Sequence, residues 1–543
     1  MYGIFVKIFH SEMTQKIPLI LSFFIIALLF SSCSKDSDLQ LDESDIAAKR
    51  ISVNHLLGIN AFEWDFLQDP VYPADGSKIF EAKFKLINSF GQFRHYLDWE
   101  KLEFTPGKYT FNQTRSGGWN LDVIYQRCKQ AGIEPLVCIK NAPNWLYKSY
   151  PVSEQNAENV PLAYPANRLL PSSYVAMAKV GFQFAARYGA NKKIDSGLLS
   201  VDTSRRWRDD IVNEVKIGLN TVKYVECNNE PDKWWKGKQA MQSAEEYAAN
   251  LSAFYDGHMG RLGKNVGVKT ADPSMVVVMG GLATPDINYV KAIVAWCKKN
   301  RGLKADGSVN LCFDVINYHL YANNIDEWHV KLFKLQRGKA PELSEQGDKA
   351  DEFVAYAHTI NKKMEVWNTE SGYDVDLSSA QKAIAIKRKS ALITQADWIL
   401  RSSLLYARHG VNRAFYYMLT DLNPTVGRFA SSGFIVGDKR KPVADYFFQV
   451  KNLMGNYVYN STVNNDPLVD IYTMEKKMMF ILTVPDEVGR TESYDLRLPK
   501  AKKAIIYQLR PGADHMTIDT VIVNNYVLKV EVSETPIFVQ AAY

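Results

Sequence analysis

Short apolar runs alternate with longer stretches of helical periodicity between about residues 55 and 420. This alternation predicts βα units around a parallel sheet, and therefore an α/β fold. Runs typical of strands occur at residues 57–62, 91–96, 134–139, 222–227, 275–280, 313–318, 365–367 and 413–418. Helical patterns separate most of them, for example at 121–130, 174–188, 244–258 and 379–409. Eight such units predict a (β/α)8 TIM barrel over residues 51–437, with its largest insertion at about 192–220.

The pattern changes after about residue 438. Shorter strand-like runs follow at residues 478–484, 494–498, 504–509, 526–532 and 537–541, and turns rich in Pro, Gly and Asn separate them. Closely spaced strands with turns of this kind are typical of antiparallel sandwiches. The sequence therefore predicts a C-terminal antiparallel β-sandwich domain over residues 438–543.

The amino terminus carries a short apolar segment. Residues 17–30 are almost entirely apolar, Lys16 precedes them, and Ser31-Ser32-Cys33 follows. The run is too short for a comfortable membrane span and is typical of an export signal. Residues 1–33 resemble a bacterial lipoprotein signal peptide. That resemblance implies lipidation of Cys33 and a cell-envelope protein that is lipid-anchored to the outer membrane, on its periplasmic or cell-surface face. A plain secretory peptide and an anchor helix are the alternatives. Residues 34–50 are polar and charged, which predicts a flexible tether.

Composition and charge argue against several functional classes. The net charge is +6, but the Lys and Arg residues are scattered, so we expect no nucleic-acid partner. None of the 6 Cys residues forms a CxxC pair, which argues against a zinc site or a redox dithiol. His95 and His258 lack carboxylate or His partners at metal spacing. We therefore expect neither a metal nor a cofactor.

Two of the expected strands end in a glutamate. In a (β/α)8 barrel the active site lies at the C-terminal ends of the strands. Asn229-Glu230-Pro231 follows the fourth expected strand, and Thr369-Glu370 follows the seventh. Hydrolysis of a glycosidic bond needs two carboxyl groups facing one cleft, because one attacks the anomeric carbon and the other protonates the leaving oxygen. If the two groups lie within about 5.5 Å, the configuration of the sugar is retained.

These motifs resemble those of clan A glycoside hydrolases, which are (β/α)8 retaining enzymes, and the loops look family 39-like or family 5-like. The resemblance covers roughly residues 55–450. It implies that Glu230 is the acid/base and Glu370 the nucleophile. It also implies that Asn229 holds the 2-hydroxyl group of the sugar.

Three further residues match the pattern of this clan. Arg94, on the second expected strand, resembles the arginine near the nucleophile. His319 and Tyr321 follow the sixth expected strand and match the His-x-Tyr pattern, which implies that Tyr321 hydrogen-bonds the nucleophile. Glu226, by contrast, is more typical of a structural carboxylate.

Aromatic residues near the strand ends are candidates for stacking on sugar rings. Trp234 and Trp235 follow the expected acid/base, and Trp145 follows the third strand, although apolar packing explains such residues equally well. Many clan members place a Trp of the eighth strand beneath the cleaved sugar. This chain departs from that pattern, so stacking there would fall to Tyr417.

The sequence thus predicts a retaining glycoside hydrolase that cleaves β-glycosidic bonds of an oligo- or polysaccharide by double displacement. Its partners would be the carbohydrate substrate and a membrane reached through the lipid anchor. Two alternatives stay open: a catalytically inactive surface glycan-binding lipoprotein, and an exo-acting β-glycosidase such as a β-xylosidase. The presence of both glutamates argues against the first, whereas loop conformation decides between endo and exo action.

Overall fold

The computed structural model describes residues 51–68, 76, 78–86, 89–111, 119–204, 212–333, 335–422, 430–437 and 439–542. The expected signal peptide with Cys33 and the expected tether at 34–50 lie outside these residues. Among the described helices, none combines the length and the apolar character that crossing a bilayer requires.

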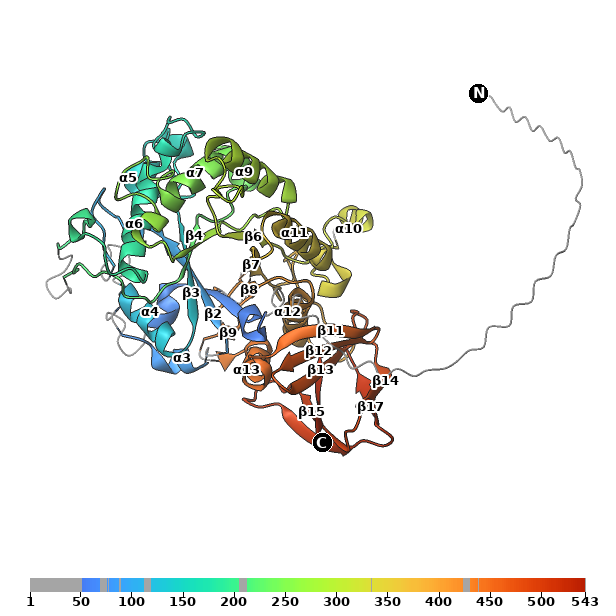
Figure 1. Ribbon diagram of the computed structural model, residues 1–543. Helices are drawn as coiled ribbons and strands as arrows, with labels where there is room; N and C mark the ends of the chain where they lie inside the picture. The colour runs from blue at the N-terminus through green and yellow to red at the C-terminus, as the bar shows by residue number, and fades with distance from the viewer. Residues whose placement is uncertain are drawn as a thin grey trace, which may run out of the picture.

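Eight parallel strands close into a barrel in the N-terminal part of the chain (Figure 1). Each strand pairs with the next one in sequence, and β8 returns to β1, where Gly58 lies opposite Phe415. The (β/α)8 TIM barrel and all eight expected strands are confirmed, with shifts at several strand ends. The strands are β1 (Gly58–Ala61), β2 (Gln92–Asp98), β3 (Glu134–Lys140), β4 (Tyr224–Cys227), β5 (Val276–Met279), β6 (Val315–His319), β7 (Glu365–Ser371) and β8 (Arg413–Tyr416).

Helices surround the barrel strands (Figure 1). The α-helices are α2 (Glu63–Leu67), α3 (Glu81–Leu86), α4 (Leu121–Gln130), α5 (Asn144–Tyr147), α6 (Val175–Tyr188), α7 (Ala244–Asp256), α8 (Val268–Ala271), α9 (Ile287–Asn300), α10 (Trp328–Phe333), α11 (Gln346–Ile360), α12 (Ala391–Arg408) and α13 (Pro442–Met454). Single 3₁₀ turns add η1 (Val53–Leu56), η2 (Trp99–Lys101), η3 (Val152–Glu154), η4 (Pro171–Tyr174), η5 (Ser196–Leu198), η6 (Trp234–Lys236) and η7 (Pro341–Leu343).

Local capping signals set the ends of the helices that the sequence predicted well. Asn120 caps α4 by accepting a hydrogen bond from Val123 N at 3.3 Å. Ser243 and Glu246 form a reciprocal capping box at the start of α7. Gly257 ends α7 in the left-handed region, with φ 65°. Short polar N-caps and a terminal glycine satisfy the backbone groups that a helix leaves unpaired at its ends.

The prediction of a helix at residues 379–409 is wrong over about its first third. Helix α12 begins at Ala391, after Ser390, which accepts a hydrogen bond from Ile393 N at 3.4 Å. Upstream of it, Ile386 and Lys389 exchange backbone hydrogen bonds of 3.1 and 2.9 Å in a tight turn. The residues before this turn bond to neighbouring loops and form no helix, so tertiary contacts override the helical propensity of the segment.

The C-terminal part is built from antiparallel sheets, as expected. Six strands pair in the order β11-β12-β13-β18-β15-β16, and β14 pairs with β17. Their bounds are β11 (Val458–Asn465), β12 (Leu468–Met474), β13 (Lys477–Thr483), β14 (Glu492–Arg497), β15 (Lys503–Gln508), β16 (Thr517–Ile522), β17 (Val527–Val532) and β18 (Ile537–Ala542). The sequence did not predict β11, β12 or β16. Before these sheets, the short pair β9 (Ile435–Val436) and β10 (Lys439–Arg440) leads into α13, which contacts α12.

The barrel and the sandwich share one apolar core. Tyr472, Met479 and Phe538 of the sandwich are fully buried in the same cluster as the residues of α12 and the barrel. Charged pairs surround this contact: Arg408 bonds Asp470 at 3.1 Å, and Lys389 lies 2.5 Å from Glu534. The sheets therefore pack directly against the barrel helices, and Figure 1 shows α12 and α13 beside β11–β13.

Candidate active site

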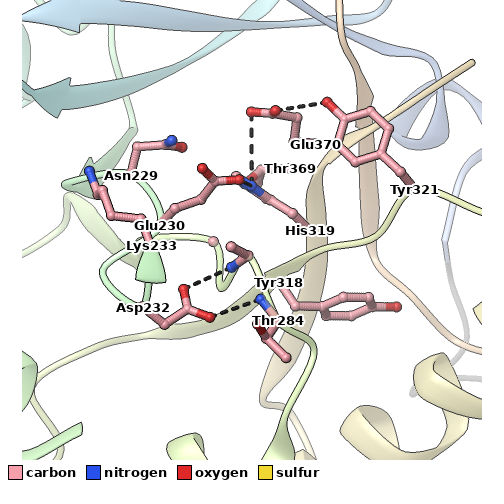
Figure 2. A network of polar contacts seen from close by, with 12 residues as sticks. Asn229, Glu230, Asp232, Lys233, Thr284, Tyr318, His319, Tyr321, Thr369 and Glu370 are labelled. Carbon is pink, nitrogen blue, oxygen red and sulfur yellow. Dashed lines mark hydrogen bonds and ion pairs between the residues drawn. The ribbon is translucent and has the colours of Figure 1, made fainter. Parts of the chain in front are cut away.

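Glu230 stands on a tightly turned loop after β4. Asn228 and Glu230 both adopt left-handed backbone conformations, with φ 65° and φ 47°. The turn is fixed to the loop after β5, because Glu230 N donates to Gly281 O at 3.1 Å. Asp232 completes the connection by accepting from Ala283 N and Thr284 N, both at 2.8 Å (Figure 2). The loop thus holds Glu230 over the mouth of the barrel.

Glu370 lies inside β7. The strand was expected to end at Trp367, with the glutamate beyond it, but it continues to Ser371. A register shift between β7 and β8, from Asn368 to Ser371, accompanies this end of the strand. The position matters because a side chain on a strand is held more firmly than one on a loop.

Both oxygens of Glu370 are held by donors from β2 and from the loop after β6. Tyr321 donates its hydroxyl to Oε1 at 2.7 Å, so the expected hydrogen bond is present. Arg94 Nη1 donates to Oε2 at 3.2 Å, and the Tyr96 hydroxyl donates to the same oxygen. Burial alone would raise the pKa of Glu370, but His319, Arg94 and the two tyrosine hydroxyls outweigh it and hold that pKa below its usual value. Glu370 is therefore an ionised carboxylate.

His319 lies between the two glutamates. Its Nδ1 is 3.0 Å from Glu230 Oε1 and 3.9 Å from Glu370 Oε2, and its Nε2 is 3.0 Å from Thr369 Oγ1 (Figure 2). Thr369 Oγ1 also accepts from Asn317 Nδ2 at 2.8 Å. Thr369 thus fixes the Nε2 side of the ring, and Nδ1 faces the Glu230 carboxyl group. The ring therefore orients the Glu230 carboxyl group.

Arg94 connects the site to the interior of the barrel. Its guanidinium makes a bidentate ion pair with Glu226, at 2.7 and 2.9 Å, and both side chains are fully buried. It also donates to Asn60 Oδ1 at 2.9 Å and to Asn229 Oδ1 at 2.8 Å. Glu226 accepts two more hydrogen bonds, from the Gly281 backbone at 3.0 Å and from Asn317 at 3.2 Å. Glu226 therefore neutralises Arg94 beneath the site, as expected for a structural carboxylate.

The geometry brings Glu230, His319 and Glu370 together, with one ligand atom of each within 4.8 Å of the others. The sequence predicted no metal-binding group. A catalytic zinc ion, however, is held by three protein ligand atoms, the number that these residues offer. The donor set fits a cation poorly, however. Both oxygens of Glu370 already accept hydrogen bonds, and the Arg94 guanidinium beside Oε2 repels a second positive charge.

The predicted aromatic residues are less closely tied to the two glutamates. Trp234 and Trp235 lie on η6 after Glu230, and they are 68% and 47% exposed. Trp145 is half-buried, donates its indole N–H to Glu103 O at 2.9 Å and packs against Trp99. Tyr417 follows β8 and meets the Tyr96 ring edge-on, with the centroids 6.2 Å apart. Tyr417 thus lies at the site, whereas the two tryptophans are exposed and meet each other edge-on, with their ring centroids 5.8 Å apart.

Several residues of the site were missed in the sequence. Tyr96 contacts both Glu370 and Asn229, the latter at 3.1 Å, and Thr369, Asn60 and Asn317 complete the hydrogen-bond network. Tyr96 could have been found, because residues two apart on a strand point to the same side and Tyr96 follows Arg94 by two. Asn60 and Asn317 carry no pattern of their own, whereas Thr369 belongs to the Thr369-Glu370 motif, in which only the glutamate was assigned a role.

Comparisons with known proteins show the fold. No protein-family model and no curated protein matches the sequence. Among solved structures, the chain is similar to a family 39 glycoside hydrolase from Bacteroides cellulosilyticus WH2, with TM-score 0.59 and 16% identity over 91% of this chain and 82% of that one. It is also similar to family 51 α-L-arabinofuranosidases from Thermotoga petrophila RKU-1, with TM-score 0.53, 12% identity and coverage of 91% and 98%, and from Bifidobacterium longum, with TM-score 0.52, 12% identity and coverage of 91% and 97%. The comparisons therefore show the fold, because this chain shares its overall architecture with these glycoside hydrolases.

Proposed function

We propose that the chain is a retaining glycoside hydrolase, with Glu370 as the nucleophile and Glu230 as the acid/base. The observation that carries this proposal is the meeting of the two carboxyl groups at one barrel mouth, with an oxygen of each within 4.8 Å of the other. Retaining enzymes hold their two carboxyl groups about 5–5.5 Å apart, whereas inverting enzymes leave about 6.5–9.5 Å for a water molecule.

The different surroundings of the two groups support the division of roles. Glu370 keeps 11% of its side chain exposed and receives hydrogen bonds from Arg94, Tyr96 and Tyr321, which favour its ionised form. Among the described residues, no Lys or Arg side chain bonds Glu230, which contacts His319 and keeps 17% of its side chain exposed. A nucleophile must be charged when substrate arrives, and an acid/base must exchange its proton with a leaving group and then with water.

The proposed reaction has two displacements. Glu370 attacks the anomeric carbon as the glycosidic C–O bond breaks, and Glu230 gives its proton to the departing oxygen. The product of this step is a covalent glycosyl–enzyme ester on Glu370. Glu230, now ionised, takes a proton from a water molecule, which attacks the same carbon and releases Glu370. The configuration at the anomeric carbon is inverted twice and therefore retained.

An oligo- or polysaccharide is the proposed substrate class. The exposed rings of Trp234 and Trp235 stand just after the acid/base, where they are available to sugar rings. A hollow of about 670 Å³ lies at the loops after β5 and β6 and is lined by Tyr321, Asn323 and Asn324 among others. A volume of this order is ordinary for a ligand site, at roughly 300–1,000 Å³. The structural neighbours include proteins named as an α-L-arabinofuranosidase, a xylanase and a xyloglucanase, so a test of the substrate must include several sugars.

Turnover of a glycan panel tests the proposal. Purified protein is incubated with β-glucans, xylans and mannans and with 2,4-dinitrophenyl glycosides, alongside Glu230→Ala and Glu370→Ala variants. We expect Glu370→Ala to lose activity toward both kinds of substrate. Glu230→Ala should lose activity toward the glycans. It should still release dinitrophenol in a first burst from the dinitrophenyl glycosides, because that leaving group needs no proton.

A carboxylate on the same strand gives the matched control. Glu365 lies at the opposite end of β7 and accepts a hydrogen bond from the Trp367 indole at 2.6 Å, so Glu365→Gln should leave turnover unchanged. Proton NMR of the first product should show retained anomeric configuration. Binding of a glycan without turnover by the wild type would support the glycan-binding alternative, and turnover that survives in Glu370→Ala would refute the nucleophile assignment.

We also propose that Cys33 is lipidated and holds the protein at the outer membrane of a bacterial envelope. The support is the apolar segment and the Ser31-Ser32-Cys33 sequence, and the polar residues 34–50 would serve as the tether. Growth with a radiolabelled fatty acid should label the wild type. Cys33→Ala should lose the label and move to the soluble fraction. Labelling that persists in Cys33→Ala would contradict the anchor.

A further inference from the structure

Two buried cysteines face each other on the outer side of the barrel. Cys297 lies on α9 and Cys312 lies shortly before β6, and both are completely inaccessible. Their Sγ atoms are 3.4 Å apart. The sulfurs of a disulfide are about 2.05 Å apart, so an approach of about 1.4 Å would join them.

The surrounding backbone already holds the two residues in place. Arg301 N and Gly302 N both donate to Cys297 O, at 2.8 and 3.2 Å, and Asn310 N donates to Gly302 O at 3.0 Å. The Arg301 side chain closes the same loop by donating Nε to Asn310 O at 2.9 Å and by pairing with Asp256 at 2.7 Å. The cysteines therefore meet in a frame that hydrogen bonds and an ion pair have fixed, and a cross-link would need no large rearrangement.

Other uses of this pair of thiols fit less well. Neither sulfur belongs to a metal-ligating group: among the described residues, such a group is found only at Glu230, His319 and Glu370. Neither thiol reaches solvent, so neither can serve as a nucleophile toward a substrate. A hydrogen bond between two thiols is weak and gives little reason for such a close approach.

We propose that Cys297 and Cys312 are a disulfide site and become joined when the chain folds under oxidising conditions. Cys128, Cys138 and Cys227, each buried, stay as thiols. The oxidant is a disulfide-bearing partner, either a protein or a small molecule. One cysteine thiolate attacks the partner disulfide and releases one partner thiolate. The second cysteine thiolate then attacks the mixed disulfide and releases the other. The two cysteines thus lose two electrons and two protons, and the partner is reduced to two thiols.

The cross-link joins α9 to the start of β6 across the segment 298–311. Because both sulfurs are inaccessible in the folded protein, the exchange takes place before α9 packs against the barrel. Once closed, the bond limits the freedom of the unfolded chain and so favours the folded form. An exported chain would meet an oxidising environment of the kind in which such bonds persist.

Peptide mapping of refolded protein tests this site. The full chain is unfolded and reduced, refolded in a mixture of oxidised and reduced glutathione, unfolded again with iodoacetamide, and digested without reductant. Mass spectrometry should find the peptides of Cys297 and Cys312 joined. Cys138 and Cys227 give the matched control: they lie on the adjacent strands β3 and β4, one residue out of register, and should be alkylated. Recovery of Cys297 and Cys312 in alkylated form would overturn the proposal.

Thermal unfolding supplies a second measurement. Wild type refolded under oxidising conditions should melt several degrees above wild type that was unfolded and refolded in reductant, and the reduced protein should match a Cys297→Ser/Cys312→Ser double variant. Cys128→Ser should keep the dependence on reductant. An equal melting temperature for oxidised and reduced wild type would count against a stabilising cross-link. Neither measurement uses catalytic activity, so the outcome is independent of the proposed hydrolase function.

Discussion

At the scale of single residues, the charge state of Glu370 depends on hydroxyl groups as well as on Arg94. Burial, opposed by Arg94 and reinforced by Glu370, raises the pKa of Tyr96 well above its usual value. Burial and the Glu370 charge do the same for Tyr321. Both tyrosines therefore stay protonated at all working pH values and act only as donors to the carboxylate.

Tyr96→Phe should reduce kcat/KM by about 10-fold to 100-fold, because a hydrogen bond to a charged group is worth roughly 1.5–3 kcal/mol. Its effect on pH dependence has a definite sign. The ionised nucleophile is the active form, and its lowered pKa keeps it active as the pH falls. Loss of a donor raises that pKa, so the acidic limb of the pH–rate profile should move to higher pH.

Two further variants control this measurement. Tyr321→Phe removes the donor to the other oxygen of Glu370 and should move the acidic limb in the same direction. Tyr459→Phe removes a hydroxyl that contacts Thr462 in the sandwich, and it should leave the profile unchanged. An acidic limb that stays in place in Tyr96→Phe would mean that the tyrosine does not set the charge state of Glu370.

The residues that the sequence predicted well are those that belong to short motifs after strands. Arg94, His319 and Tyr321 do contact the two glutamates, and this follows from the strand order once a barrel is expected. Asn60 and Asn317 were missed because single amides inside apolar strands resemble ordinary buried polar residues. Their roles depend on Arg94 and Glu226, which are distant in sequence and meet only when the barrel closes.

At the scale of elements, the loop after β4 is locked to the loop after β5. Asp232 accepts two backbone hydrogen bonds, from Ala283 and Thr284, and Glu230 N donates in the other direction to Gly281. Figure 2 shows Asp232 directed toward the β5 loop and Glu230 directed toward His319. The two side chains share one loop, so the position of the acid/base depends on the carboxylate of Asp232.

Asp232→Ala should lower kcat by about 10-fold to 100-fold, because a displacement of about 1 Å in a catalytic group has effects of this size. Asp232→Asn keeps one acceptor oxygen and should retain most of the activity. If Asp232 only stabilised the fold, both variants would lose melting temperature and activity together. Kinetics on a glycan and on a dinitrophenyl glycoside should show the loss mainly on the glycan, where protonation by Glu230 is needed.

The elements differed in how well their patterns predicted them. Barrel strands are buried on both faces and read as continuous apolar runs, which is why all eight were found. Strand β16, with mostly exposed residues at an edge of the sheet, and β11, which is rich in Asn, lack that signal. The far end of β7 was missed because its polar residues Asn368 to Ser371 are buried by the site itself.

At the scale of the whole molecule, a lysine at the barrel–sandwich contact neutralises two buried acids. Lys389 Nζ lies 2.9 Å from Asp397 of α12 and 2.5 Å from Glu534 of the sandwich. The side chains of both acids are almost fully buried, whereas 23% of the lysine is exposed. Burial raises the pKa of Asp397, and Lys389 opposes that shift. One cation thus holds two parts of the chain together.

Lys389→Ala should destabilise the protein by about 3 kcal/mol at neutral pH, because it leaves buried charges without a partner. The pKa of Asp397 is already raised in the folded state, so folding favours its protonated form and stability falls as the pH rises through that pKa. Removal of Lys389 raises the pKa further. The loss in melting temperature should therefore be larger at neutral pH than in acid, where Asp397 is protonated.

An exposed ion pair tests whether burial causes the loss of stability in Lys389→Ala. Arg127 and Glu81 are joined at 2.8 Å on the surface, and Arg127→Ala should change the melting temperature little. A deficit in Lys389→Ala that does not vary with pH would point to lost packing of the lysine stem and away from the buried acids.

The guanidinium of Arg94 reaches groups on or directly after three other strands, through Asn60 of β1, Glu226 of β4 and Glu370 of β7. A substitution of Arg94 therefore affects both the stability of the barrel and the active site. In a library of random variants, positions 94 and 226 should be depleted by selection for soluble protein as strongly as by selection for turnover. Positions 96 and 321, whose hydroxyl groups bond Glu370 and, for Tyr96, Asn229, should tolerate change to Phe in the first selection and not in the second. If such a chain evolved into a sugar-binding protein without catalysis, the first substitutions would then fall at Tyr96 and Tyr321, and Arg94 would be retained.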